Sequence, residues 1–398
     1  MTSDHRLVCL TTSAACGGAE TSLLTLLRAL RNQEPTWAIT VIAPASGPLL
    51  GKCRSLGLST LVIPYPAALS RLGESGSTHG RLIGQGMRVA VTLPQYVTRL
   101  RRSLRDIGAT IVHSNGVKAH VAAALAKPRG VRLVWHLHDY LQPRPMTTAL
   151  LRRLARRADA IVANSESVRA DAALALGDTG IRRVHNAVDL TVFKPDGHRM
   201  DLAALAGLPD DASLVRVGLV ATFARWKGHE VFIEAIERLH TRARLDLRAY
   251  IIGGAVYETE GSQWSIDELK RLVCARGLSH VIGFTGHLDD VPAAMRSLDI
   301  VVHASTAPEP FGMVIAESMA SARPVVAVDT GGASELFSDR IDGLAYPARN
   351  AAELAERIAS LMADPSWRAV LGAEARRTAC ARFSPDRMAS EFREAYRG

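Results

Sequence analysis

Short apolar segments alternate with longer amphipathic ones along this chain, and the alternation starts a second time near its middle. Strand-like apolar runs of the first series lie at residues 7–10, 39–42, 61–63, 110–113, 133–137 and 160–163. Those of the second series lie at residues 215–221, 249–252, 281–284, 300–303 and 324–328. Helical patterns such as 21–30 and 229–240 separate most of these runs. Because such alternation is typical of parallel sheets covered on both faces, it predicts an α/β protein with two Rossmann-like domains facing each other.

The stretch 193–211 divides the two series, and its proline, aspartate and glycine content is typical of a linker. A length of 398 residues agrees with two domains. We therefore expect a first domain over 1–193 and a second over 194–382. Residues 73–86, which are rich in glycine, serine and threonine and have little apolar pattern, predict a mobile loop in the first domain.

Positive charge is concentrated in the first half of the chain. The whole chain has a formal net charge of +9, with +14 in residues 1–195 and −5 in the remainder. Such an excess points to nucleic acid, an anionic membrane or an acidic substrate as partner. No nucleic-acid recognition motif accompanies it, so nucleic acid is disfavoured. Two arginine-rich amphipathic segments, 88–105 and 150–157, are of a kind that lies on anionic lipid, with ordinary surface helices as the alternative.

The cysteine pattern and the hydropathy indicate the compartment. Five scattered cysteines include no CxxC pair, so neither a disulfide framework nor a zinc site is expected. The N-terminal segment shows no signal-peptide core, and no uninterrupted apolar stretch is long enough to span a bilayer. We expect a cytoplasmic protein. Peripheral association with the inner face of the membrane is compatible with this expectation.

A glycine pair follows the first predicted strand and precedes a helix. Gly17 and Gly18 would let backbone N–H groups approach an anion at the N-terminus of that helix. The alternative is a tight turn that only requires positive φ. The full GxGxxG pattern of dinucleotide-binding proteins is absent, which argues against an NAD(P)-dependent oxidoreductase.

Two cations follow the first predicted strand of the second domain. Arg225 and Lys227 come directly after the strand-like run 215–221. Ligands of α/β sheets bind beyond the carboxyl ends of the strands, where this pair would clamp a diphosphate and stabilise a leaving group. The alternative is a solvated surface pair.

The segment 307–317 combines two carboxylates with the start of a helix. Glu309 lies in the predicted loop, and Glu317 lies eight residues later on the helix. The turn over 311–314 would present free backbone N–H groups at the positive end of that helix. Carboxylates accept hydrogen bonds from sugar hydroxyls and amides donate to phosphate, so this segment would bind both parts of a sugar nucleotide.

The string from Glu309 to Glu317 resembles the E-x7-E motif of retaining glycosyltransferases with the GT-B fold, in the glycosyltransferase 4 group. The resemblance extends over nearly the whole chain. Other segments that are similar to family motifs are the glycine loop at 17–20, the histidine segments at 111–115 and 135–139, the stretch 185–189, the loops at 284–286 and 330–335, and the tail 383–396. The resemblance implies a GT-B architecture in which the C-terminal helix, 383–398, crosses back to the first domain.

The resemblance also implies roles for individual residues. Glu317 would hold the ribose, Glu309 would lie by the donor sugar, and Lys227 would bind the diphosphate. His138 matches the acceptor-side histidine, with His136 as the second choice. The family's arginine falls at Thr222 here, so the resemblance leaves two alternatives: Arg225 replaces it, or the diphosphate clamp is weaker. The donor-binding set is completed by the glycine loop and the helix amides, namely Gly17, Gly18, Phe311, Gly312, Met313 and Val314.

The function implied is retaining transfer of a hexose from a nucleotide diphosphate sugar, of the UDP or GDP type, to a hydroxyl acceptor. The acceptor side is expected in the first domain and the donor side in the second, with products in glycolipid, cell-surface polysaccharide or glycosylated natural-product synthesis. No Asp-x-Asp occurs, so we expect a metal-independent enzyme without a cofactor, although the His136-x-His138 spacing would also suit a metal. The alternatives are a sugar-nucleotide epimerase or phosphorylase on the same fold and a non-catalytic sugar-binding or membrane-binding protein.

Overall fold

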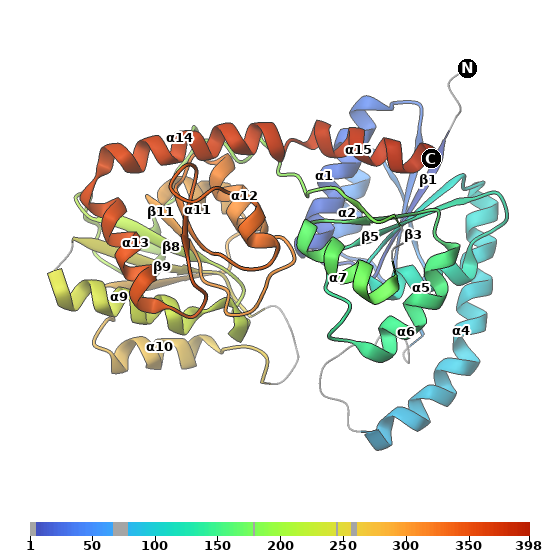
Figure 1. Ribbon diagram of the computed structural model, residues 1–398, viewed down its shortest axis with the longest axis horizontal. Coiled ribbons are helices and arrows are strands. Elements are labelled where there is room, and N and C mark those ends of the chain that lie inside the picture. Colours follow the sequence, from blue (N-terminus) through green and yellow to red (C-terminus); the bar gives the residue numbers. More distant parts are fainter. Residues whose placement is uncertain (1–4, 67–78, 178–179, 244–245, 256–260) are drawn as a thin grey trace. The chain divides into compact units, whose positions relative to one another are not determined.

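The computed structural model describes residues 5–66, 79–177, 180–243, 246–255 and 261–398. Two compact units make up the chain (Figure 1). Unit 1 contains residues 1–187 and 385–398, and unit 2 contains residues 188–384. Each unit is built around one parallel sheet, with seven strands in unit 1 and six in unit 2 among the described residues. The prediction of two Rossmann-like α/β domains is therefore confirmed.

The sheet of unit 1 has the strand order β3-β2-β1-β4-β5-β6-β7. Its strands are β1 (Arg6–Thr11), β2 (Ala38–Ala43), β3 (Ser59–Val62), β4 (Ile111–Asn115), β5 (Arg132–Leu137), β6 (Ala160–Ala163) and β7 (Arg182–Arg183). The order reverses between β1 and β4, which are paired in parallel. In open α/β sheets, ligands bind beyond the carboxyl ends of the strands at such a reversal.

Helices cover both faces of this sheet because successive strand residues point to opposite sides. Leu7 and Cys9 of β1 pack in one core with α1 (Gly18–Gln33), α2 (Pro48–Ser55) and α15 (Pro385–Arg397). Val8 and Leu10 pack in the other core. The helices on that second side are α4 (His79–Ile107), α5 (Val117–Ala126), α6 (Pro145–Leu154) and α7 (Glu166–Leu176), and the short η1 (Ala155–Arg157) follows α6.

The loop predicted at residues 73–86 is partly wrong. Residues 73–78 lie outside the described residues, and residues 79–86 form the start of α4. This helix is amphipathic over its described turns, where Tyr96, Leu100 and Leu104 are buried in the core of unit 1. Packing of that apolar face outweighs the low helix propensity of the glycines in the first turns of α4.

The sheet of unit 2 has the order β10-β9-β8-β11-β12-β13 and reverses between β8 and β11. Its strands are β8 (Val215–Val220), β9 (Leu247–Ile252), β10 (Ile282–Gly286), β11 (Ile300–His303), β12 (Val325–Val328) and β13 (Leu344–Tyr346). Its helices are α8 (Leu202–Ala206), α9 (His229–Ala243), α10 (Ile266–Ala275), α11 (Val291–Ser297), α12 (Met313–Ala320), α13 (Ala351–Ala363) and α14 (Pro365–Arg382), with the short η2 (Arg225–Lys227) and η3 (Gly332–Glu335).

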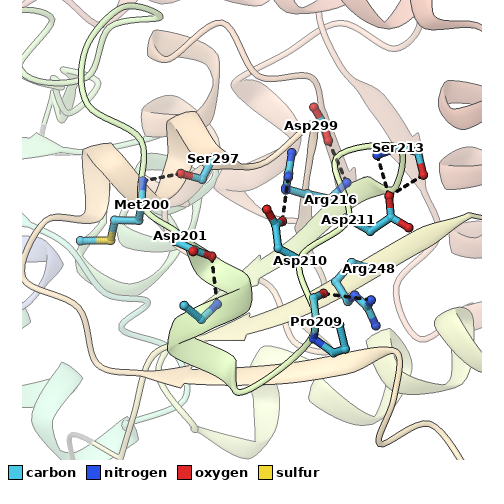
Figure 2. A network of polar contacts seen from close by, with 11 residues as sticks. Met200, Asp201, Pro209, Asp210, Asp211, Ser213, Arg216, Arg248, Ser297 and Asp299 are labelled. Atoms are coloured by element: carbon cyan, nitrogen blue, oxygen red, sulfur yellow. Dashed lines mark hydrogen bonds and ion pairs between the residues drawn. The ribbon is translucent and has the colours of Figure 1, made fainter.

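The predicted linker belongs to unit 2 in this structure. The sequence placed the domain boundaries at 193/194 and 382/383, whereas the units divide at 187/188 and 384/385. Val188 N–H donates to Phe383 O (2.9 Å) within unit 2. Figure 2 shows that Met200 N–H donates to Ser297 Oγ (2.7 Å) and that Arg216 N–H donates to Asp299 Oδ2 (2.8 Å). Val188 and Arg216 lie on either side of the segment, and the segment itself is attached to unit 2 by Met200 and by His198 O, which accepts from Arg296 Nε (2.7 Å). Its composition, by contrast, is typical of a free connection.

The C-terminal helix completes the core of unit 1. Helix α15 packs against α1, and its residues Met388, Phe392 and Tyr396 are fully buried beside β1, β4 and β5. A hydrogen bond of 2.7 Å joins the Tyr396 hydroxyl to His113 Nδ1 on β4. The expectation that a C-terminal helix returns to the first domain is therefore confirmed, and the returning segment begins at residue 385.

Candidate functional site

Glu309 is the centre of a polar cluster in unit 2. Lys227 Nζ lies 2.7 Å from its Oε1, and His303 Nε2 lies 2.6 Å from its Oε2. Ser305 Oγ donates to the same Oε2 (2.8 Å). The Lys227 and Glu309 side chains are 17% and 12% exposed, so the pair is largely shielded while one edge remains open to a ligand. The structure thus brings together the lysine and the loop carboxylate that the sequence selected.

The fold places this cluster at the reversal of strand order in unit 2. Lys227 follows β8, and His303 is the last residue of β11, which pairs with β8. Gly228 has φ +76, and a Cβ there would lie 1.8 Å from Ala304 O. Only glycine allows this approach of the two backbones. The residue after the lysine therefore fixes the distance between the two strand ends.

Two opposing effects set the charge of Glu309. Burial favours its neutral form, but the positive Lys227 and the hydrogen-bonded His303 outweigh burial and hold the pKa of Glu309 well below its ordinary value. Glu309 is therefore an ionised carboxylate whose two oxygens already accept hydrogen bonds. Such a group suits binding and orientation better than nucleophilic attack.

Glu317 contrasts with Glu309. It lies on the second turn of α12, and burial raises its pKa to about 7. Among the described residues, its carboxylate has no hydrogen-bond or ion-pair partner. A half-buried carboxylate without a partner is costly in the free protein, but it can accept hydrogen bonds from the hydroxyl groups of a ligand.

The turn before α12 presents backbone donors next to this carboxylate. Gly312 caps the helix with φ +94 in the left-handed region, and α12 begins at Met313. Within the described residues, the N–H groups of Met313 and Val314 donate no backbone hydrogen bond outside the helix. The loop is fixed from the other side, because Gly332 N–H donates to Glu309 O (2.8 Å). Phe311 is buried and closes the turn.

Arg225 does not join the Glu309 cluster. Its guanidinium donates to Glu268 Oε1 (3.0 Å) and to Gly261 O (3.2 Å), and it stacks on the Trp264 ring at 3.8 Å. A 3₁₀-helix has three residues per turn, so side chains two positions apart point to different sides. The position of Arg225 in η2 therefore directs it to the loop before α10 rather than to Glu309.

His138 of unit 1 follows β5, near the carboxyl end of β4. Its Nε2 donates to Asn115 Oδ1 (2.6 Å), and burial lowers its pKa to about 3. The neutral ring therefore has its bare nitrogen at Nδ1. His136, the second choice from sequence, is fully buried in the core with its ring 3.9 Å from that of His138. His138 is the more accessible of the two histidines.

The glycine pair of unit 1 lies where the sequence placed it, at the start of α1. Gly17 is the N-cap residue with φ −84, an extended conformation that other residues also adopt. The alternative that this turn requires positive φ is therefore wrong for Gly17. A Cβ at Gly17 would lie 3.0 Å from Glu20 Oε2, so the absence of a side chain leaves room for the carboxylate of Glu20. Burial raises the pKa of Glu20, which hydrogen-bonds to Thr11 and to the N–H of Gly17.

Sequence reasoning missed three residues of these clusters. His303 and Ser305 hold Glu309, and Glu20 lies under the glycine loop. One signal was available, because His303 is a titratable residue at the end of an otherwise apolar strand. Within the described ranges, no group of three His, Cys, Asp or Glu side chains is arranged to hold a metal ion.

Comparisons with known proteins identify the family of the chain. Residues 16–192 match the family model described as Glycosyltransferase Family 4, and residues 214–378 match the model described as Glycosyl transferases group 1. The lipopolysaccharide core biosynthesis mannosyltransferase LpcC of Rhizobium leguminosarum bv. viciae is 32% identical over 252 residues, which are 63% of this chain and 67% of that protein. The chain belongs to the glycosyltransferase 4 group of GT-B glycosyltransferases, as the resemblance of its motifs implied.

A second relative and a solved structure cover more of the chain. The alpha-D-kanosaminyltransferase of Streptomyces kanamyceticus is 28% identical over 325 residues, which are 75% of this chain and 81% of that protein. The crystal structure of Anabaena HepE in complex with UDP-glucose is similar with a TM-score of 0.79 and 25% identity, over 98% of this chain and 99% of that one. This chain is therefore a glycosyltransferase, and the similar HepE structure contains UDP-glucose.

Proposed function

We propose that this glycosyltransferase moves a hexose from a nucleotide diphosphate sugar of the UDP or GDP type to a hydroxyl acceptor, with retention at the anomeric carbon and without a metal ion or cofactor. One observation carries the proposal. The ionised Glu309, paired with Lys227, lies in the same segment as the free N–H groups of α12 and the unpartnered Glu317. These groups match the chemical parts of a nucleotide sugar.

Each group has a role in donor binding. Lys227 and the N–H groups at the start of α12 stabilise the negative charge that grows on the diphosphate as the glycosidic bond breaks. Glu309 accepts hydrogen bonds from the donor sugar, and Glu317 accepts them from the ribose hydroxyls. Arg225 has the smaller role, because it is already bound to Glu268 and Trp264. The similarity to HepE bound to UDP-glucose supports a donor of the UDP type.

Retention is proposed on the resemblance to the retaining glycosyltransferases of this group, and the charge state of Glu309 disfavours a double displacement as its route. The bond from the anomeric carbon to the phosphate oxygen breaks while the bond to the acceptor oxygen forms on the same face, and a phosphate oxygen takes the hydroxyl proton. A double displacement would require a free carboxylate as nucleophile. Glu309 is a poor nucleophile, because Lys227, His303 and Ser305 already bind its two oxygens.

Unit 1 is proposed to hold the acceptor, and Gly17 and Gly18 of the same unit are proposed to take part in donor binding. His138 accepts a hydrogen bond from the acceptor hydroxyl at Nδ1 and orients it without taking the proton, since its pKa is only about 3. The LpcC relative is named for lipopolysaccharide core biosynthesis, which supports an acceptor in glycolipid or cell-surface polysaccharide synthesis. Glycosylated natural-product synthesis remains the other proposed context.

The proposed place of action is the cytoplasm and the inner face of the membrane. No helix within the described residues is long and apolar enough to cross a bilayer. The formal charge of +14 in residues 1–195 favours contact with an anionic surface by unit 1.

A panel of UDP- and GDP-sugars tests the donor. Thermal stability of the protein is measured with each compound, and the anomeric configuration of the product is read by NMR once an acceptor is found. We expect one nucleotide sugar to raise the melting temperature and K227A to abolish that shift. K270A removes an exposed lysine of α10 and is the matched control, which keeps the shift. If the folded protein responds to no nucleotide sugar, or the product is inverted, the proposal is wrong.

A further inference from the structure

The outer side of unit 1 carries a group of arginines without partners. Arg129, Arg152, Arg153, Arg156 and Arg157 are exposed, and within the described residues their side chains form no ion pair or hydrogen bond. Some other arginines of unit 1 are bound, since Arg101 donates to Leu125 O and Ala126 O and Arg169 pairs with Glu166. Among the described residues, Arg99, Arg102 and Arg105 of α4 resemble the group in having no side-chain partner. We call this group, with the exposed apolar residues of α6 and α7 described below, the α6 surface.

Acidic side chains near the α6 surface do not neutralise it. Asp159 is bound by Lys127 Nζ (2.5 Å) and by Leu133 N–H (2.6 Å). Asp171 accepts from Leu141 N–H (2.5 Å). The five arginines therefore form a local excess of positive charge.

Two hollows run along the α6 surface and share Arg156 as a wall. One has a volume of about 510 Å³ and is lined by the segment 127–132 together with Arg156, Arg157 and Asp159, whose carboxylate is paired with Lys127. The other has a volume of about 830 Å³ and lies between α6 and α7, which are adjacent (Figure 1). Its lining includes Arg152, Arg153 and Leu174. Anionic groups of the size of a phosphate can therefore enter between the guanidinium groups.

Large apolar side chains protrude next to these cations. Met146 is 83% exposed and Leu150 is 45% exposed, and the two lie on one face of α6 because they are four residues apart. Leu174 of α7 is 76% exposed at the edge of the larger hollow. The opposite side of α6 is fixed in the core by Leu151. The exposed apolar groups are thus held outward on a rigid element.

The second arginine-rich segment of the sequence does not share this property. In α4, Tyr96, Leu100 and Leu104 are buried in the core of unit 1, so its described apolar face is not available to a partner. Arg99, Arg102 and Arg105 remain exposed on the same helix. The structure therefore separates two segments that have the same composition in the sequence.

We propose that the α6 surface docks unit 1 on an anionic lipid bilayer. The arginines bind lipid phosphates, while Met146, Leu150 and Leu174 enter the boundary between headgroups and acyl chains. A soluble polyanion would use the charge but would leave these apolar side chains in water. The inference extends the proposed function, because docking would bring an enzyme with a lipid-linked acceptor to its substrate. Each arginine near such a surface is worth about a five-fold change in binding.

Co-sedimentation of the full chain with vesicles tests the docking. Vesicles of phosphatidylcholine alone are compared with vesicles in which phosphatidylglycerol replaces part of that lipid, at low and high salt. The α6 variant is R152Q/R153Q/R156Q, and the matched control is R99Q/R102Q/R105Q, which removes the same charge from α4. We expect binding to the anionic vesicles only, a loss of about 100-fold in the α6 variant and less than five-fold in the control. The variant M146S/L150S/L174S should lose the binding that remains at high salt.

Several results would overturn this assignment. Equal losses in the α6 variant and the control would show a diffuse charge effect without a docking surface. Binding to heparin but not to vesicles would identify a soluble polyanion as the partner. The nucleotide-sugar shift in melting temperature is measured on every variant, and it should not change, because none of the substituted residues belongs to the proposed donor-binding set. A protein that binds vesicles but no nucleotide sugar would refute the proposed function and leave the docking intact.

Discussion

Replacement of Glu317 by glutamine is expected to stabilise the free protein while it weakens donor binding. In the structure, burial raises the pKa of this carboxyl from its ordinary 4.5 to about 7, and no described residue compensates it. Folding is therefore opposed whenever the group is ionised. The penalty is absent below pH 4.5, grows as the pH rises from 4.5 to 7, and is constant above that range.

The size of the effect follows from the shift in pKa. A shift of one pKa unit corresponds to about 1.4 kcal/mol, so the full shift sets an upper value of about 3.5 kcal/mol. Relaxation around a group that keeps some contact with water reduces this, and we expect E317Q to raise the free energy of unfolding at pH 8 by about 1–3 kcal/mol. For a unit of this size, that gain raises the melting temperature by about 3–10 °C.

Calorimetry of E317Q and of the wild type at pH 8 and at pH 4.5 measures this effect. E230Q changes an exposed glutamate of α9 and is the matched control, with a change of less than about 0.5 kcal/mol. The amide also loses one hydrogen-bond acceptor for the ribose hydroxyls, so the affinity for the nucleotide sugar should fall by about ten-fold or more. A variant that is less stable than the wild type at pH 8, or equally stabilised at both pH values, would refute the reasoning.

Three further substitutions separate the roles of neighbouring residues. H303A removes a group that lowers the pKa of Glu309. A carboxylate with a lowered pKa stabilises the fold while it is ionised, and this contribution is lost as the pH falls. Acid unfolding, followed by circular dichroism, should therefore begin at a higher pH in H303A than in the wild type. R225A should weaken donor binding by less than about ten-fold in calorimetric titration, because Arg225 is bound to Glu268. K227A should weaken it by about 100-fold or more, and equal losses in the two variants would place both cations on the diphosphate. N115L removes the side-chain oxygen that accepts the hydrogen bond from His138 Nε2, so kcat should fall by about ten-fold while the affinity for the donor is unchanged. A parallel loss of donor affinity would contradict the assignment of His138 to the acceptor substrate.

Much of the fold could be predicted from the sequence because buried parallel strands have a simple pattern. Runs such as 7–10 and 300–303 are apolar on both faces, and each is a strand of the structure. The position of the linker at 193–211 was harder to predict. Its composition indicates irregular structure, but it does not indicate which of the two units the segment packs against. Contacts with distant parts of the chain place it on unit 2, such as those of Met200 with Ser297 and of His198 with Arg296.

The site was predictable where one local segment carries it. One loop and the helix that follows it hold Glu309, Glu317 and the turn between them. Their positions relative to one another can therefore be predicted from their spacing in the sequence. The partners of Glu309 come from β11 and from the segment after β8, and their approach depends on Gly228 and strand pairing. Arg225 could not be placed from its spacing. It lies two residues before Lys227 in the sequence, but in a 3₁₀ turn the two side chains point to different sides.

The return of α15 to unit 1 has a consequence for synthesis on the ribosome. The core of unit 1 needs Phe392 and Tyr396, which are translated only after the whole of unit 2, residues 188–384. At ordinary elongation rates that interval is about 10–40 s. Unit 2 is continuous in the chain and can fold during this time, whereas the nascent N-terminal segment must wait with part of its apolar core uncovered. The half of the enzyme that is made first is therefore the half that is finished last, and it is the half most exposed to chaperones and proteases during its production.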